Sequence, residues 1–213
     1  MKTKLAPGIY AILAAKFSRG RSNIEVAEEM VKAGVTTLQY REKIPSKSLG
    51  KMFEECVAIR KITRKAGVKF IVNDHADMAL MVEADGIHTG QEDLPVKELR
   101  KIVGKMIIGC STHSPEQAQK ALLDGADYIG VGPIFTTRTK ENVCDAVGFE
   151  YLDYVAANIN IPFVAIGGIK RHNLGKVVRH GAKTVCLVTE ITEAEDIGKT
   201  IREIQAIYRE NIK

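Results

Sequence analysis

Short apolar runs alternate with longer charged segments along the whole of this 213-residue chain. The runs are rich in Val, Ile and Leu and apolar at consecutive positions, which is typical of strands buried on both faces of a parallel sheet. The pattern predicts eight strands, at Gly8–Leu13, Thr36–Arg41, Lys69–Asn73, Gly86–Thr89, Met106–Cys110, Tyr128–Phe135, Phe163–Ile166 and Thr184–Val188.

The segments between these strands have the periodicity and the end signals of amphipathic helices. Apolar positions recur three and four residues apart, and Pro115 stands where a first-turn proline loses no hydrogen bond. Capping boxes, which satisfy the free N–H groups at a helix start, are predicted at Ser22–Glu25, Ser114–Gln117 and Thr192–Glu195. Glycines that end a helix before the next strand are predicted at Gly34, Gly67, Gly104, Gly125 and Gly181.

Eight strand–helix units in sequence predict an α/β fold, a (β/α)8 TIM barrel that forms a single domain over residues 1–213. A doubly wound open sheet is the competing arrangement. No linker, low-complexity segment or break in composition divides the repeats, which favours the barrel. In such a barrel, functional residues stand at the carboxyl ends of the strands.

Composition narrows the environment and the partners. No apolar stretch is long enough to span a membrane, and residues 1–7 lack the apolar run of a signal peptide, so we expect a cytoplasmic protein without a membrane partner. The four cysteines are scattered, which argues against a zinc site and a disulfide framework. A net charge of +5 without a basic, aromatic-rich tract argues against nucleic acid and suits small anionic substrates.

The second strand ends in polar side chains. Gln39, Arg41 and Lys43 alternate along the chain and therefore fall on one face of the strand. Both faces of a barrel strand are covered, so such groups need water, a partner or a ligand. They predict an anion site, unless Lys43 already lies in the loop and Arg41 pairs with Glu42 or another acid.

Two carboxylates follow the third and fourth strands. Asp74 follows Asn73 directly, and Asp93 lies just beyond the fourth strand. Each could cap the next helix, since aspartate is a good N-cap. Because the ends of adjacent strands are neighbours, the two would also form a pair of oxygen ligands suited to Mg²⁺, with Glu92 as a weaker third candidate.

The fifth to eighth strands supply further candidates for binding an anion. Ser111 is free to face the mouth, and His113 is a weaker acid/base candidate. The hydroxyls and the ammonium of Thr136, Thr137, Thr139 and Lys140 are phosphate donors, in a loop to Val147 long enough to predict a lid. After strands seven and eight, where barrels often bind phosphate, stand Gly168, Val188 and Thr189.

In their order along the chain, these segments resemble the thiamine-phosphate synthase family. The matching segments are Leu38–Lys43, Asn73–Asp74, Gly86–Leu94, Gly109–His113, Asp127–Lys140 and Ala165–Ile169. The resemblance implies a transferase that condenses 4-amino-2-methyl-5-hydroxymethylpyrimidine diphosphate with 4-methyl-5-(2-phosphoethyl)thiazole, or its carboxylated form, to thiamine phosphate and pyrophosphate. Its partners would then be these small phosphorylated molecules, and a homo-oligomer remains open.

The family's site residues carry over position by position. The resemblance implies that Gln39, Arg41, Lys43 and Asn73 bind the pyrophosphate, and that Asp74 and Asp93 hold one Mg²⁺ per subunit. Ser111 and Lys140 would line the reacting centre, and Arg41, Lys43, Ser111 and Lys140 would be the catalytic set. The thiazole phosphate would be bound by Thr137, Thr139, Gly168, Val188 and Thr189. Pyrophosphate would leave first, and the thiazole nitrogen would attack the resulting cation.

Two positions depart from the family pattern. His75 stands where arginine is common, and Thr189-Glu190 stands where Ser-Ala is usual, which leaves the orientation of Glu190 open. The runner-up is the thiazole tautomerase of the same superfamily, whose catalytic histidine the resemblance places at Pro133. A non-catalytic phosphate-binding barrel is the second alternative, although it predicts losses among the charged ligands that this chain does not have.

Overall fold

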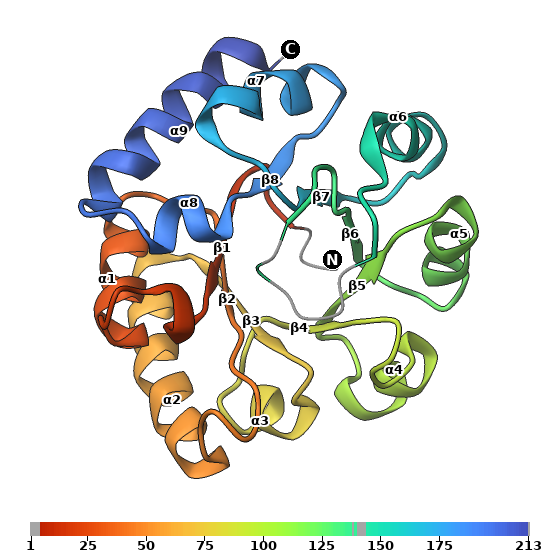
Figure 1. Cartoon of the computed structure of the whole chain (residues 1–213). Coiled ribbons are helices and arrows are strands. Elements are labelled where there is room, and N and C mark those ends of the chain that lie inside the picture. Colours follow the sequence, from red (N-terminus) through yellow and green to blue (C-terminus); the bar gives the residue numbers. More distant parts are fainter. Residues whose placement is uncertain (1–4, 138, 140–143, 213) are drawn as a thin grey trace.

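The computed structural model describes residues 5–137, 139 and 144–212, and it shows a closed barrel inside a ring of helices (Figure 1). Eight parallel strands pair in sequence order, and the first pairs with the eighth to close the barrel. The predicted (β/α)8 barrel is therefore confirmed, and the competing open sheet is wrong. No helix in the described part of the chain has the length and apolar character needed to cross a membrane.

The strands are short, from three to six residues. They are β1 Gly8–Leu13, β2 Thr37–Tyr40, β3 Lys69–Asn73, β4 Gly86–Thr89, β5 Ile107–Thr112, β6 Tyr128–Val131, β7 Phe163–Ile166 and β8 Thr184–Cys186. The helices are η1 (a 3-10 turn) Ala15–Phe17, α1 Asn23–Lys32, α2 Leu49–Ala66, α3 Ala76–Met81, α4 Val96–Val103, α5 Pro115–Leu123, α6 Gly148–Asn158, α7 Arg171–Arg179, α8 Val188–Thr192 and α9 Ile197–Asn211.

Three strands end earlier than predicted, β2 by a single residue at Tyr40. β6 ends at Val131 rather than at Phe135, because the chain turns inward against the end of β7 and donates from Ile134 and Phe135 N–H to the carbonyls of residues 166 and 167. β8 ends at Cys186 rather than at Val188, because the chain coils at once into the short helix α8. The early ends of β6 and β8 thus place a loop and a short helix, rather than further strand, at the mouth of the barrel.

The helix-end predictions are confirmed in part. Ser22 forms a full capping box with Glu25, and Pro115 occupies the first turn of α5. The Ser114 hydroxyl accepts from the Gln117 N–H. The Gln117 side chain accepts from the N–H of His113 rather than from that of Ser114, so this capping box is incomplete. The box predicted at Thr192–Glu195 is wrong, because α9 starts later, with Asp196 as its cap. The five predicted helix-ending glycines all have positive φ.

The barrel has two separate cores. The larger core fills the layer between the strands and the surrounding helices. The smaller core lies inside the barrel and contains Leu5, Tyr10, Ile12, Ile71, Ile107, Tyr128, Val164 and Cys186. Gly109 of β5 makes room there, since a Cβ at this position would lie 2.0 Å from Cζ of Tyr128. The interior is thus plugged by large side chains below an open mouth.

Candidate active site

A cavity of 570 Å³ lies at the carboxyl ends of the strands, within the range typical of small-molecule sites. The predicted residues that line it are Arg41, Lys43, Asn73, Asp74, Asp93, Ser111, Thr137, Thr139, Gly168, Val188 and Thr189. One predicted residue does not line it: Gln39 is 2 % exposed and lies deeper in the barrel. Lys140 lies outside the described residues, as does part of the predicted lid.

Charged side chains from β2, β3 and the β4 loop form one end of the cavity. Lys43 Nζ lies 2.6 Å from Asp74 Oδ2, so the two neutralise each other. Burial raises the pKa of the Asp74 carboxyl, Lys43 lowers it, and the charge of Asp93 raises it again, with a net upward shift. The two aspartates are therefore close enough to repel each other, as adjacent strand ends predicted.

Neither aspartate is a helix cap. His75 is the N-cap residue of α3 and Pro95 that of α4, and neither helix start donates to a side-chain cap. Asp93 Oδ2 instead accepts from Gly90 N–H at 2.9 Å, which fixes its loop beside the cavity. The helix-cap alternative for Asp74 and Asp93 is therefore wrong.

The donor set at this end fits a magnesium ion. Asp74, whose pKa is raised, and the neighbouring Asp93 form an incomplete oxygen site, and Mg²⁺ takes its remaining ligands from water and phosphate. Within the described residues no cluster of three or more His, Cys, Asp or Glu side chains forms a site built from protein ligands alone. Glu92 is exposed and does not line the cavity, so the third candidate does not join the pair.

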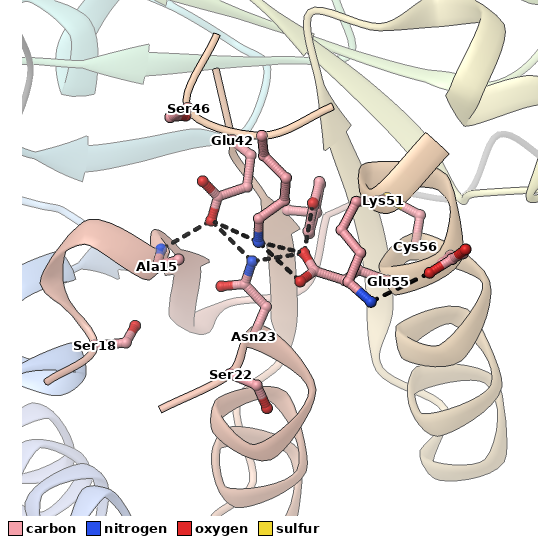
Figure 2. A network of polar contacts seen from close by, with 12 residues as sticks. Ala15, Ser18, Ser22, Asn23, Glu42, Ser46, Lys51, Glu55 and Cys56 are labelled. Carbon is pink, nitrogen blue, oxygen red and sulfur yellow. Dashed lines mark hydrogen bonds and ion pairs between the residues drawn. The ribbon is translucent and has the colours of Figure 1, made fainter. Parts of the chain in front are cut away.

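Arg41 lines the cavity and forms no ion pair with any described residue, so the predicted alternative of a pair with Glu42 or another acid is wrong, although Lys43 does lie in the loop beyond β2. Glu42 turns the other way, into a buried network behind the site (Figure 2). Its Oε1 accepts from Ala15 N–H and from Asn23 Nδ2, both at 2.8 Å. Just beyond the end of β2, Arg41 thus faces the cavity and Glu42 the protein interior.

The network continues to α2 through Glu55. Figure 2 shows Asn23 between Glu42 and Glu55, and its Nδ2 also donates to Glu55 Oε2 at 2.9 Å. Tyr40 Oη and Lys47 Nζ donate to the same carboxylate, each at 2.7 Å to Oε2. Burial raises the pKa of Glu55, but the Lys47, Asn23 and Tyr40 donors outweigh it and hold the pKa below its ordinary value. This network anchors both ends of the loop that carries Lys43.

Ser111 of β5 lies between the cavity and the polar groups of the barrel interior. Its Oγ is 2.9 Å from His88 Nε2, and its carbonyl accepts from Gln91 Nε2 at 2.6 Å. His88 itself lines the cavity. His113 also lines it and bonds through Nδ1 to the Gly132 carbonyl.

Backbone groups and hydroxyls form the opposite end of the cavity, after β6, β7 and β8. Gly167 and Gly168 have φ of 100° and 63°, a left-handed conformation that glycine adopts without strain. The carbonyls of Gly167 and Gly168 accept from Phe135 N–H and Asn173 Nδ2, which turns them away from the cavity. Thr137 and Thr139 face it with their hydroxyl oxygens 3.1 Å apart.

Lys170 joins this end, although the sequence reading missed it. Its Nζ donates to Thr189 Oγ1 at 2.9 Å and lies 3.4 Å from Glu190 Oε2. Glu190 also pairs with Arg171 at 2.7 Å; burial raises its pKa, but these two cations lower it below the ordinary value. Glu190 therefore points to α7 rather than to the cavity, which answers the question of its orientation.

Both Lys170 and His88 carry signals in the sequence. Lys170 directly follows the Gly-Gly-Ile turn after the seventh strand. His88 stands two residues after Gly86 on β4, at an inward-facing position of a barrel strand. A side chain that can bond through two nitrogens, at an inward position next to the mouth, indicates a site residue.

The barrel and its cavity define a class of protein first: a (β/α)8 barrel whose strand ends surround a small-molecule cavity lined by charged side chains, hydroxyls and a glycine turn. The family model described as thiamine monophosphate synthase matches residues 9–191. The chain therefore belongs to the thiamine monophosphate synthase family, which confirms the resemblance and the prediction of an enzyme.

Relatives and solved structures agree with this family. The chain is 57 % identical to a thiamine-phosphate synthase of Pelotomaculum thermopropionicum over 204 residues, or 95 % of this chain and 93 % of the relative. It is 52 % identical to that of Caldicellulosiruptor saccharolyticus over 95 % and 91 %. A solved thiamine phosphate pyrophosphorylase from Pyrococcus furiosus superimposes with a TM-score of 0.89 at 32 % identity, over 100 % and 99 % of the two chains.

Proposed function

We propose that the chain is a thiamine-phosphate synthase. It would join a hydroxymethylpyrimidine diphosphate to a phosphoethylthiazole, giving thiamine phosphate and pyrophosphate. The observation that carries the proposal is one cavity with two unlike polar ends, one lined by cationic and acidic side chains, the other mainly by backbone and hydroxyls. A cavity of that design suits two phosphorylated substrates held face to face. The proposal includes a cytoplasmic location and one Mg²⁺ per subunit.

The charged end is suited to the leaving group. Arg41, Lys43 and Asn73 would bind the pyrophosphate, with Lys140 as a further proposed ligand. The bond from the pyrimidine methylene carbon to oxygen breaks with its electron pair going to the pyrophosphate, and the cations balance that growing charge. A magnesium ion held by Asp74 and Asp93 would supply further charge neutralisation there.

The opposite end is suited to holding the nucleophile still. Thr137, Thr139, Gly168, Val188 and Thr189 would bind the thiazole phosphate, and Ser111 would lie at the reacting centre. The thiazole nitrogen then uses its lone pair to form the new bond to the methylene carbon. That nitrogen carries no proton to lose, so the step requires no general base. Positioning and charge compensation supply the rate.

A turnover assay tests this proposal. The protein is incubated with both substrates and Mg²⁺, and thiamine phosphate and pyrophosphate are measured in equal amounts. Arg41→Ala should lower kcat/KM for the pyrimidine diphosphate about a hundredfold, because a charge partner of the leaving group is lost. Arg64→Ala, on the exposed side of α2, is the matched control. Bound thiazole phosphate without any product would overturn the synthase and favour the tautomerase or a binding protein.

A further inference from the structure

A continuous chain of hydrogen bonds runs through the barrel interior and ends at the cavity. Gln39 Nε2 lies 2.8 Å from Tyr10 Oη, and Tyr10 Oη lies 2.8 Å from Tyr128 Oη. Tyr128 Oη lies 2.9 Å from His88 Nδ1, and His88 Nε2 lies 2.9 Å from Ser111 Oγ. The chain thus links β2, β1, β6, β4 and β5, and its last member faces the substrates.

We propose that this chain fixes the direction of every hydrogen bond in it, so that Ser111 is held as a hydrogen-bond donor toward the substrate. Gln39, Tyr10, Tyr128 and His88 are then positioning residues, and Ser111 is the group that touches the reactants. The role of Ser111 toward the substrate rests on the proposed function. The placement of the protons along the chain can be tested without turnover.

The direction follows from the number of protons. An amide nitrogen only donates, so Tyr10 Oη accepts from Gln39 and its own proton is left for Tyr128 Oη. The proton of Tyr128 is then left for His88 Nδ1. If the two phenols were reversed, the Tyr10 proton would have no acceptor among the described residues, which is costly for a buried hydroxyl.

The two phenol hydroxyls are buried and therefore cannot bond to bulk water instead of to each other. Tyr10 and Tyr128 are 2 % and 1 % exposed, and neither lines the cavity. Burial raises the pKa of both, so both keep their protons. Gly109 provides the space for the Tyr128 ring, because any Cβ there would overlap it. Both phenols therefore bond within the protein rather than to bulk solvent.

The consequence falls on the imidazole and then on the serine. With Nδ1 as an acceptor, the His88 proton sits on Nε2 and is donated to Ser111 Oγ. Because Ser111 already accepts this bond, its own hydroxyl proton points into the cavity. That proton would be donated to an acceptor atom of the substrate, such as a pyrimidine nitrogen or a pyrophosphate oxygen.

The first measurement locates the proton on His88. Long-range ¹H–¹⁵N spectra of the histidine rings, with His88 identified from its loss in His88→Gln, should show a protonated Nε2 and a bare Nδ1. Tyr128→Phe should mix the two tautomers, since Nδ1 loses its donor. Tyr151→Phe is the matched control, because its buried hydroxyl bonds to Thr112 and lies outside the chain. A wild-type proton on Nδ1, alone or in addition, would overturn the proposal.

The second measurement asks whether Tyr128 acts through Ser111. Tyr128→Phe and Ser111→Ala should each lower kcat about tenfold, with KM changed less, as expected for one lost hydrogen bond. The double variant should be no slower than Ser111→Ala, whereas additive losses would overturn the proposal. If Tyr128→Phe does not fold, Gln39→Leu should mix the tautomers, and an unmixed Nε2 form would overturn the role of Gln39. If the wild type makes no product, the proposed function fails, but the spectra still show whether the hydrogen bonds have the proposed direction.

Discussion

The two ends of the cavity, each proposed to bind an anion, are built from different groups. At the β2–β4 end the groups are charged side chains, Arg41 and Lys43 beside Asp74 and Asp93. At the β6–β8 end the groups are hydroxyls and a tight glycine turn, with φ of 100° and 63° at Gly167 and Gly168. The difference matches their proposed tasks. A leaving group changes its charge during the reaction, whereas the phosphate of the nucleophile keeps its charge and only has to stay in place.

The two ends are also supported differently. Behind Arg41 and Lys43 lies a buried network of acids and donors around Glu42 and Glu55 (Figure 2). Behind Gly168 lies close-packed backbone, since a Cβ there would be 2.7 Å from Phe135 Cβ and 2.8 Å from the Thr136 carbonyl. The first end is thus held by electrostatics and the second by steric fit. Substitutions should therefore affect them in different ways.

Asp93→Asn should have the largest effect on activity. The change removes one of the two charges proposed to hold Mg²⁺. Asparagine has nearly the same shape as aspartate, so its side-chain oxygen can still accept from the Gly90 N–H. We expect kcat to fall about a thousandfold, because charge neutralisation of the leaving group is lost. Turnover measured across a magnesium titration checks this, with Asp77→Asn on the exposed surface of α3 as control. Wild-type activity and magnesium dependence in Asp93→Asn would rule out a metal role for this end.

Gly168→Ala tests the opposite end. The added methyl meets Phe135 and Thr136, and alanine is strained at a φ of 63°. We expect KM for the thiazole phosphate to rise about tenfold with a smaller change in kcat, since the turn shifts while the leaving-group site is untouched. Gly50→Ala in α2, where a Cβ meets nothing within 4 Å, is the matched control. A fall in kcat without a change in KM would break the division between the ends.

The fold could be predicted almost entirely from the sequence. Eight buried strands, their order and the helix-ending glycines follow from local patterns that recur eight times. The errors occur where backbone conformation is decided by neighbours that are distant in sequence. β6 ends early because its chain turns against β7, and the Thr192 cap fails because α8 forms directly after β8.

The candidate site was predicted less completely, for a related reason. Residues at the strand ends, such as Arg41, Asp74 and Asp93, were found because a barrel brings strand ends together. Gln39 was placed at the cavity because alternation gives the face of a strand but not the depth along the barrel axis. The partner of Glu42 could not be predicted, since Asn23 belongs to α1 and lies close only in the folded chain. Depth and inter-element contacts require three-dimensional information.

Glu55→Gln should lower the stability of the protein more than it weakens substrate binding at the charged end. It weakens the bonds to Lys47 and Tyr40, and we expect a loss of about 2–3 kcal/mol in the free energy of unfolding at pH 7. The pKa of Glu55 is lowered on folding, so its carboxylate stabilises the protein above its ordinary pKa of 4.5, and this contribution is lost as pH falls through the lower folded value. Urea unfolding of both proteins at pH 7 and at acid pH checks this.

The control for this comparison is Glu54→Gln, the exposed neighbour on α2. It should unfold like the wild type at both pH values, because an exposed ion pair contributes little. In Glu55→Gln we also expect KM for the pyrimidine diphosphate to rise a few-fold, since the loop that carries Lys43 is held less firmly. A difference in stability that stays the same at neutral and acid pH would show that the ionised carboxylate is not what stabilises the loop.

The smallest effect on substrate binding is expected from Lys170. Its ammonium is a charged group at the end of the cavity that otherwise consists of hydroxyls and backbone. Lys170→Met removes the donor to Thr189 and leaves Glu190 with Arg171 alone, so a negative charge is less well balanced beside the proposed phosphate. We expect KM for the thiazole phosphate to rise about threefold, within the range of a partly exposed ion pair. The double variant Lys170→Met/Glu190→Gln should recover most of that loss, because it removes the unbalanced charge. Recovery would mean that Lys170 balances Glu190, whereas no recovery would mean that its ammonium binds the phosphate directly and that this end, too, depends on charge.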